Sequence, residues 1–267
     1  LKKIFKTTFY NFFLKVHGKI EKSIAENSDD RIEVSIISEE KNLSYKVYKI
    51  KDARIYTDRI HDTAVILDNK IINGPSFQLR YTENRHIYNG KVDDNIVFQK
   101  GTPRIMRKLN NSVLSLLTGG AGNSNYWHWM FDVLPRLNLC NKFIKLNEID
   151  YFLLPSLSKK FQIESLNLLN IPNKKRISSE KFRHVKVKKL IVTDHPVVTT
   201  GNASIDIQNI PRWITQWLKE SFVDKNSLNK KENIKKVFIE RKINKNGSIP
   251  FRFIENEEEV KACLLMR

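Results

Sequence analysis

One stretch near the middle of the chain, residues 119–137 with the sequence GGAGNSNYWHWMFDVLPRL, constrains the fold more than any other. Its first part consists of residues that form loops and begin helices: Gly119, Gly120, Gly122, Asn123, Ser124 and Asn125. Glycine allows the backbone to approach a ligand closely, and the first amides of a helix lie at its positively polarised end. The stretch therefore predicts a loop and a helix start that can bind an anion or a hydroxyl group, although Asn and Ser also serve as ordinary helix caps.

Three polar residues follow at successive turns of this predicted helix: His128, Asp132 and Arg136. Residues four positions apart share one helix face, so His128 and Asp132 form a candidate acid–base pair. The structural alternative is a hydrogen bond on the helix surface, or an ion pair between Asp132 and Arg136. Pro135 lies within the same helix, where it removes a backbone donor and predicts a kink.

The other residues of this helix are apolar or aromatic, and two interpretations of its tryptophans stay open. Trp127 and Trp129 can stack on the faces of a sugar ring, or they can belong to the hydrophobic core. The glycine-rich loop contains neither the GK[ST] of a P-loop nor the GxGxxG of a dinucleotide fold. The loop alone is therefore a weak functional signal.

The order of apolar segments predicts an α/β fold. Residues 31–98 contain short β-like runs, which are IEVSII, YKVYKI, ARIYTD, TAVILDNKII, FQLRYT and NIVFQ, and form a β-rich entry region. Predicted strands at residues 113–117, 151–154 and 185–192 then alternate with the helix described above and with helices at 161–169 and 210–222. Ligands of such sheets bind beyond the carboxyl ends of the strands.

Residues 1–30 predict a basic amphipathic helix. Large apolar residues recur there at helical spacing among lysines: Phe5, Phe9, Phe12, Phe13 and Val16. Such a helix can lie on an anionic membrane surface through residues 1–20, or it can pack on its own domain or on a protein partner. No apolar run reaches the ~18 to 20 residues of a membrane span, and the first residues lack the features of a signal peptide. The sequence therefore predicts a cytoplasmic protein whose membrane contact, if it has one, is peripheral at the inner face.

The charge of the chain favours anionic partners. Lys and Arg outnumber Asp and Glu by 47 to 29, which gives a net charge of +18. The densest basic cluster lies within residues 174–189, but no nucleic-acid recognition motif accompanies it, so no specific nucleic acid is predicted as a partner. Cys140 and Cys263 are far apart and lack the spacing of metal ligands, so no metal site is predicted.

Two motifs resemble those of a known family. The string NYWHWMFDVLPRL resembles the signature of glycosyltransferase family 61, in which Asn-Tyr-x-His-Trp is followed by Asp and then by Leu-Pro-Arg-Leu. A second stretch, FIERKINKNGSIPFRFIENEEEV at residues 238–260, resembles the family's downstream element, with an Arg at a strand end, a second Arg and then Asn-Glu. Two motifs in the expected order are more specific than either alone.

The resemblance implies an inverting glycosyltransferase of the GT-B type, with two Rossmann-like lobes. Such an enzyme moves a sugar from a nucleotide-sugar donor to a hydroxyl group of a glycan acceptor, here in surface polysaccharide or glycoconjugate synthesis. It implies an acceptor-side lobe at residues 31–222, a linker at 223–232 and the beginning of the donor lobe at 233–267. The family's His-Gly-Ala-Gly loop is not reached within these residues, so we expect an incomplete donor lobe and weak or no turnover from this chain.

The resemblance also implies roles for single residues. Asp132 is expected to act as the catalytic base with His128 as the competing candidate, and Arg241 and Arg252 are expected to hold the donor phosphates. The expected substrate-binding residues are Gly120, Gly122, Asn125, Tyr126, Trp129 and Arg136. The nucleotide sugar is a co-substrate, and no cofactor or metal is implied. The alternative from another class is a basic module that binds nucleic acid or a membrane surface without catalysis.

Overall fold

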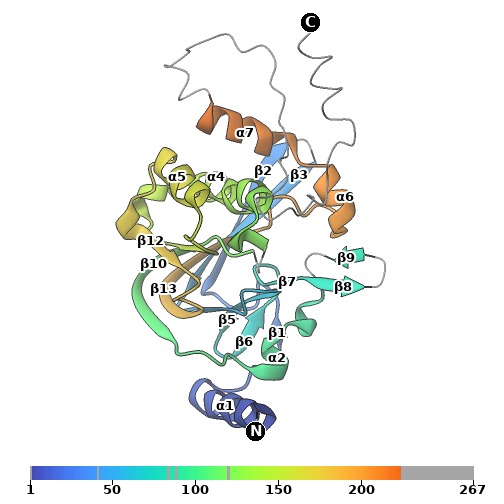
Figure 1. The fold of residues 1–267 in the computed structure, drawn as a ribbon, viewed down its shortest axis with the longest axis vertical. Helices are drawn as coiled ribbons and strands as arrows, with labels where there is room; N and C mark the ends of the chain where they lie inside the picture. The colour runs from blue at the N-terminus through green and yellow to red at the C-terminus, as the bar shows by residue number, and fades with distance from the viewer. Residues whose placement is uncertain (1, 41, 83–84, 88–89, 119–120, 224–267) are drawn as a thin grey trace, which may run out of the picture. The chain divides into compact units, whose positions relative to one another are not determined.

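The computed structural model describes residues 2–40, 42–82, 85–87, 90–118 and 121–223 (Figure 1). These residues belong to one compact unit, residues 1–225, which is separate from residues 226–267. The donor lobe predicted at 233–267, and nearly all of the predicted linker, lie outside the described residues.

A mixed sheet of 11 strands forms the centre of this unit, which confirms the α/β class. Its main path runs β1-β6-β5-β4-β13-β10-β11-β12, while β3 joins β13 to β2 and β7 pairs with β5. The strands are β1 (Ser23–Ile24), β2 (Ile32–Glu40), β3 (Leu43–Lys51), β4 (Arg54–Thr57), β5 (Asp62–Leu67), β6 (Lys70–Ile72), β7 (Phe77–Gln78), β10 (Arg107–Ser115), β11 (Tyr151–Leu154), β12 (Arg176–Ser178) and β13 (His184–Thr193). A separate pair is formed by β8 (Arg80–Thr82) and β9 (Arg85–Ile87).

The helices lie mainly between and after the strands of the second half. They are α1 (Lys2–His17), α2 (Val97–Lys100), α3 (Tyr126–His128), α4 (Pro135–Asn141), α5 (Lys160–Leu168), α6 (Ala203–Gln208) and α7 (Arg212–Phe222). Short turns of other helix types are η1 (Val92–Asp94), η2 (Ala121–Asn123), η3 (Trp129–Val133), η4 (Leu146–Glu148) and η5 (Asn173–Lys175). The predicted helices at 161–169 and 210–222 are confirmed as α5 and α7. Among the described residues, no helix has the length and hydropathy required to cross a bilayer.

Four strands of the sheet, β10, β11, β12 and β13, are parallel, and β10 lies between β11 and β13. Val113 of β10 lies beside Tyr151 of β11 on one side and beside Leu190 of β13 on the other. Parallel strands are usually buried on both faces, which accounts for the continuous apolar runs in the sequence. The chain leaves β10 toward β11 and later returns to its other side as β13, so the strand order reverses at β10. Ligands of open α/β sheets bind beyond the carboxyl ends of strands at such a reversal.

The β-rich entry region extends the same sheet. β3 pairs antiparallel with the second half of β13, and β4 pairs antiparallel with its first half. β2 continues the sheet beyond β3, and β5 continues it beyond β4. Residues from the entry region therefore reach the edge at which β13 ends.

Two segments differ from the prediction. The run NIVFQ, predicted as a strand, overlaps α2. The Ile96 amide donates to Oδ2 of Asp62 at 2.6 Å, and Gly101, with φ of 60°, ends a single helical turn. The predicted N-terminal helix ends at His17 instead of near residue 30. Gly18, with φ of 78°, donates its amide to the carbonyl of Leu14 at 3.0 Å, which is a helix end that favours glycine.

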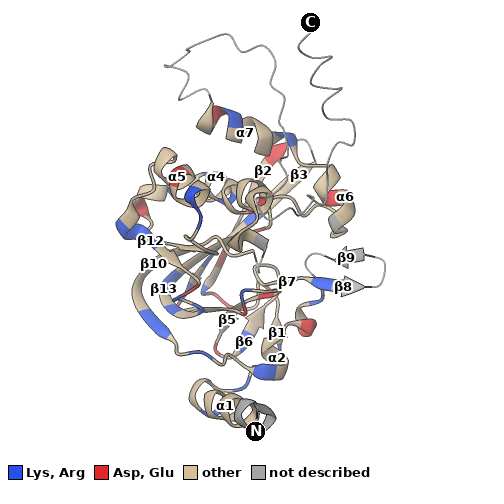
Figure 2. Cartoon of the chain, in the orientation of Figure 1, with Lys and Arg blue, Asp and Glu red and all other residues tan. Residues whose placement is uncertain are grey.

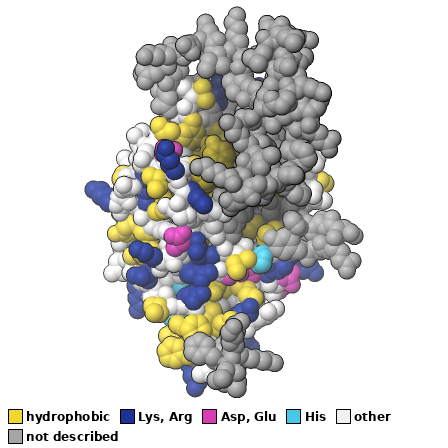
Figure 3. Space-filling view, in the orientation of Figure 1, with side chains coloured by type: hydrophobic (Ala, Val, Ile, Leu, Met, Phe, Trp, Pro, Cys, Tyr) yellow, Lys and Arg dark blue, Asp and Glu magenta, His cyan; other side chains and the backbone are white. Residues whose placement is uncertain are grey.

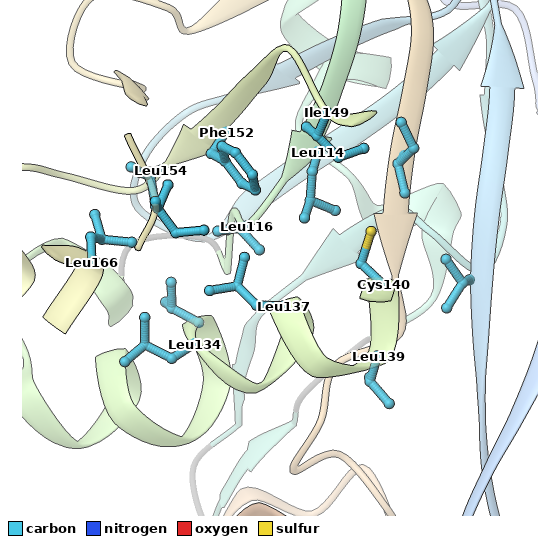
Figure 4. Packing of buried hydrophobic residues seen from close by; sticks show 14 of the residues in the cluster. Leu114, Leu116, Leu134, Leu137, Leu139, Cys140, Ile149, Phe152, Leu154 and Leu166 are labelled. Carbon is cyan, nitrogen blue, oxygen red and sulfur yellow. The ribbon is translucent and has the colours of Figure 1, made fainter. Parts of the chain in front are cut away.

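The largest hydrophobic core lies between the parallel strands and the helical segment that follows β10 (Figure 4). In this view Leu137 and Cys140 point from the helix toward side chains of the strands, whereas Leu139 points away from them. The helix supplies Leu134, Leu137, Leu139 and Cys140, and the strands and their ends supply Leu114, Leu116, Phe152 and Leu154. Burial raises the pKa of the Cys140 thiol to about 12, so it stays uncharged as a small core residue. This packing fixes the segment that carries His128 and Asp132.

Candidate active site

The helical segment after β10 begins at a side-chain cap. Asn125 has an extended backbone, and its Oδ1 accepts hydrogen bonds from the amides of Trp127 at 2.9 Å and His128 at 3.4 Å. Two of the amides that a helix start leaves unsatisfied are thereby bonded within the chain. Asn125 therefore acts as a helix cap in this structure, and the cap sets the position of His128.

The segment then passes through a π turn. The amide of Leu134 donates to the carbonyl of Trp129, five residues earlier, at 3.1 Å, within η3. Pro135 follows as the first residue of α4, where its missing amide is tolerated. The predicted interruption of the helix is confirmed in this form. Single π turns within helices are uncommon and are frequent at functional sites.

His128 and Asp132 contact each other across this turn. Nδ1 of His128 lies 2.5 Å from Oδ2 of Asp132, and 16% of the His128 side chain but only 1% of the Asp132 side chain is exposed. Burial raises the pKa of Asp132, while the hydrogen bond from His128 and the charges of His128 and Arg136 lower it. With Nδ1–H donated to the carboxylate, Nε2 of His128 is the nitrogen able to accept a proton.

A second histidine lies at the other oxygen of the same carboxylate. Nδ1 of His195 is 3.6 Å from Oδ1 of Asp132, and its ring stacks on Phe77 with centroids 4.7 Å apart. Burial, followed by the charges of Arg136 and His128, lowers the pKa of His195 well below its usual value. His195 is therefore uncharged at neutral pH, and Asp132 lies between two imidazoles.

Arg136 completes this group. Its Nε donates to the backbone carbonyl of Asp132 at 3.0 Å, and its side chain is buried. Burial lowers the pKa of Arg136 to about 10, while the carboxylates of Asp132 and Asp194 oppose that shift. Because a pKa of about 10 is above neutrality, the guanidinium remains charged at pH 7. The sequence suggested a side-chain ion pair between Asp132 and Arg136 as the structural alternative. In the structure Arg136 instead donates to the backbone carbonyl of Asp132, and the two opposite charges attract each other.

A cavity of about 600 Å³ adjoins this group at the carboxyl ends of β10 and β13. Ser115 and Leu117 line it from the end of β10, and Thr193 and Asp194 line it from the end of β13. The site thus lies where the strand order reverses. Its ionisable lining residues are Glu26, Lys46, Tyr48, Arg136, Asp194 and His195, and Asn27 and Asn73 add two amide side chains. Neither Asp132 nor His128 is among the residues that line the cavity, but His195 and Arg136, which both contact Asp132, are.

The charges of the cavity are paired with each other. The Lys46 ammonium forms an ion pair with Glu26, and the Tyr48 hydroxyl donates to Oε2 of Glu26 at 2.9 Å. The amide of Lys46 donates to Oδ2 of Asp194 at 2.7 Å. Burial raises the pKa of Asp194, and the hydrogen bond from Lys46 and the charges of Lys46 and Arg136 lower it. The cavity therefore presents many hydrogen-bonding groups with little excess charge.

Two predicted substrate-binding residues have structural roles in the described unit. Trp129 is fully buried, and its Nε1 donates to Oγ of Ser165 at 2.8 Å, so this indole belongs to the core and has no face free for a sugar. Gly122 is required by packing, because a Cβ atom there would lie 2.8 Å from Cγ2 of Val133 and 2.9 Å from Oγ1 of Thr118. Its amide donates to that Thr118 hydroxyl at 3.2 Å.

The remaining predicted site residues divide into two groups. Tyr126 is 59% exposed at the start of α3, with its ring against Phe161. Gly120, Arg241 and Arg252 lie outside the described residues. Within the part of the chain that the structure covers, no group of three or more His, Cys, Asp or Glu side chains is placed to hold a metal ion.

Part of the basic cluster at 174–189 also has a structural role. Lys175 donates from Nζ to the carbonyl of Asn147 at 2.9 Å, and Arg176 donates to the carbonyl of Ile171 at 2.9 Å. Figure 2 shows Lys and Arg positions on many elements of the ribbon. The net positive charge is therefore distributed widely over the unit.

Sequence reasoning did not identify the second histidine or the cavity. His195 carries a recognisable signal, because it follows the carboxyl end of a predicted parallel strand. Lys46 and Tyr48 carry none, because only the antiparallel pairing of β3 with β13 brings them to this edge. Glu26 carries none either, because it follows β1, which joins the sheet beside β6.

Comparison with known proteins matches the second half of the chain to one family. The family model described as Glycosyltransferase 61 matches residues 126–267, which is more than half of the 267 residues. The matched range begins at Tyr126 and includes His128, Asp132, Arg136 and His195. No curated protein and no solved structure matches the chain.

Proposed function

Because the chain belongs to glycosyltransferase family 61 and is therefore a glycosyltransferase, we propose that it transfers a sugar, with inversion, from a nucleotide-sugar donor to a hydroxyl group of a glycan acceptor. The setting that we propose is surface polysaccharide or glycoconjugate synthesis in the cytoplasm. The observation that supports the chemical proposal is the 2.5 Å contact between His128 and the buried Asp132 within the matched range.

His128 takes the role of the base in this proposal. Asp132 is sealed from solvent, so an acceptor hydroxyl cannot reach its carboxylate without a rearrangement, whereas His128 retains exposed surface. Asp132 keeps the proton of the imidazole on Nδ1 and stabilises the imidazolium that forms. The sequence-based preference for Asp132 as the base is thus replaced by a pair in which Asp132 positions His128.

The reaction is a single displacement. Nε2 of His128 accepts the proton of the acceptor hydroxyl as the hydroxyl oxygen forms a bond to the anomeric carbon of the donor. The bond from that carbon to the diphosphate oxygen breaks, and its electron pair leaves with the nucleoside diphosphate. Arg241 and Arg252, which lie outside the described residues, are proposed to stabilise the negative charge of this leaving group. That no metal takes part stays a prediction.

We further infer that the cavity holds one sugar unit of the acceptor, namely the unit next to the one whose hydroxyl group reacts. Its paired charges favour an uncharged sugar, whose hydroxyls can both donate to Glu26 and accept from Lys46 or Tyr48. An anionic sugar would leave a charge without a partner in a site whose cations are already paired. The residues that select the acceptor thus come largely from the β-rich entry region, before the matched range.

The test uses the full-length protein with a panel of nucleotide sugars and neutral glycan acceptors. We expect release of a nucleoside diphosphate that depends on the acceptor, and NMR of the product should show an anomeric configuration opposite to that of the donor. Retention of the donor's configuration would contradict the single displacement, while release without acceptor would indicate hydrolysis. If the protein instead bound nucleic acid with steep salt dependence and released no diphosphate, the non-catalytic alternative would be correct.

A further inference from the structure

Three large apolar side chains project from one face of the molecule, although they come from two distant parts of the sequence. Phe12 and Val16 of α1 are 60% and 55% exposed, and Ile105, in the segment before β10, is 81% exposed. We name these three residues the α1 face. In Figure 3 hydrophobic side chains gather over α1 at the bottom of the view, with Lys and Arg side chains beside them.

The α1 face is one continuous surface, because α1 is fixed to the segment that carries Ile105. Nε2 of His17 and the carbonyl of Arg104 lie 2.9 Å apart, and Val16 and Met106 line the same hollow. Phe12 and Val16, four residues apart, lie on one side of the helix. On the adjoining side of the helix, Phe13 is buried, and its ring stacks on that of His17 with centroids 5.4 Å apart.

The tight contact of α1 with the body leaves its outer side uncovered by the rest of the described unit. Gly101, with φ of 60°, allows Leu14 to approach so closely that a Cβ atom would lie 2.7 Å from Cδ2 of Leu14. The ring of His17 also meets the ring of His184, with centroids 4.7 Å apart. One side of this helix therefore packs on its own domain, as the second alternative expected, and the other side is exposed.

The surroundings of the α1 face are positively charged. Neither residues 1–20 nor residues 100–118 contain Asp or Glu. Among the side chains that the structure describes there, the exposed cations are Lys15, Lys19, Lys100, Arg104, Arg107 and Lys108. Two carboxylates border the hollow beside Val16, but Asp52 is paired with Lys188 and Asp68 is paired with Arg31. The field around the three apolar side chains is thus positive.

We propose that the α1 face docks the protein on an anionic lipid bilayer. Phe12, Val16 and Ile105 enter the boundary between head groups and acyl chains, while the surrounding cations contact anionic head groups. A bilayer fits this surface better than a second copy of the chain does, because a second copy brings the same excess of positive charge to the interface. The proposal is independent of the transfer reaction, since none of these residues belongs to the His128–Asp132 group or to the cavity.

The test is co-sedimentation of the full chain with vesicles of phosphatidylcholine alone and of phosphatidylcholine mixed with phosphatidylserine. We expect binding to the mixed vesicles that falls steeply with added salt. A double variant, Phe12→Ser with Ile105→Ser, should bind the mixed vesicles more weakly by a factor of about ten or more. The matched control is Ile36→Ser with Ile60→Ser, because these side chains are 67% and 60% exposed on other elements, and it should bind like the unchanged protein.

Circular dichroism of both double variants distinguishes lost docking from lost folding. Vesicle binding that is equal in both double variants, or that does not need phosphatidylserine, would overturn the proposal. A third result would also overturn it: if the protein bound no vesicles, and size-exclusion chromatography showed a dimer that Phe12→Ser with Ile105→Ser converts to a monomer, the α1 face would be a contact between copies of the chain.

Discussion

Nδ1 of His128 lies 2.5 Å from Oδ2 of Asp132, and within this pair only the imidazole has appreciable exposed surface. A buried carboxylate that accepts from one ring nitrogen fixes the proton there and leaves the other nitrogen as the acceptor. The two residues therefore have different proposed tasks, since Asp132 positions the imidazole and His128 transfers the proton. Because both tasks serve one step, the activity losses of the two single variants are not expected to add in the double variant.

Asp132→Asn is expected to lower kcat by about 10³- to 10⁴-fold while it changes KM little. The amide preserves the shape of the side chain but favours the imidazole tautomer with its proton on the wrong nitrogen. Initial rates of nucleoside diphosphate release measure this loss. The control is Asp150→Asn, because Asp150 binds Ser112 at 2.8 Å at the start of β11, away from the cavity, and this variant should turn over normally. A kcat within a few-fold of the unchanged enzyme would refute the positioning role of Asp132.

Tyr48→Phe is expected to raise KM for a neutral acceptor about 5- to 10-fold with little change in kcat. The substitution removes the hydroxyl that donates to Glu26 at 2.9 Å and alters one wall of the cavity, but it leaves His128 and Asp132 untouched. Acceptor titrations at saturating donor give both constants. An unchanged KM for every acceptor would show that the acceptor does not occupy this cavity, even if transfer itself were confirmed.

The buried His184 is expected to make the protein less stable as the pH falls. Burial, followed by the charge of Arg54 3.2 Å away, lowers the pKa of His184 to about 3. Since the unfolded chain binds a proton near pH 6.5 and the folded chain does not, stability is fully present above 6.5 and is lost toward pH 3. From pH 7 to pH 5 the loss is about 2 kcal/mol for this residue alone.

Urea unfolding of the unchanged protein and of His184→Gln at both pH values tests this expectation. The variant is less stable at pH 7, because the packing against His17 changes, but its further loss between pH 7 and pH 5 should be smaller by about 2 kcal/mol. An equal pH dependence in both proteins would mean that His184 is not the titrating group.

Gly122→Ala is expected to destabilise the protein by about 1–3 kcal/mol. The added methyl group would lie 2.8 Å from Val133 and 3.0 Å from Pro155, and the crowding would push on the π turn that carries Asp132. Chemical denaturation measures the change in the free energy of unfolding. If Gly122→Ala kept full stability but weakened acceptor binding, the result would contradict this packing role and support the predicted role of Gly122 in substrate binding.

The sequence predicted those elements whose signals are local. β11, α5, β13 and α7 were each marked by an apolar run or a periodic face that ends at a turn or a proline. Pro135 predicted the interruption of the helix, although the sequence did not show that it would take the form of a π turn. The prediction of a strand at residues 95–99 was wrong because one short apolar run fits a strand and a single helical turn equally well.

The candidate site was predictable only where it is contained in one segment. The spacing of His128 and Asp132 predicted their contact, because residues four apart face each other on a helix. The approach of His195 to Asp132 depends on the register of β13 beside β10, and the place of Glu26 depends on how β1 and β3 join the sheet. Pairings between such distant segments leave no pattern in a single sequence. The sequence also did not predict that Trp129 is buried, because an indole can pack in a hydrophobic core or stack on a sugar ring equally well.

The most direct test of the central claim is kcat of the double variant His128→Gln with Asp132→Asn beside the two single variants in the full-length protein. If Asp132 acts through His128, each single variant loses about 10³-fold or more, and the double variant loses no more than the worse single one. A His128→Gln enzyme that turns over at the unchanged rate, or losses that multiply in the double variant, would contradict the account.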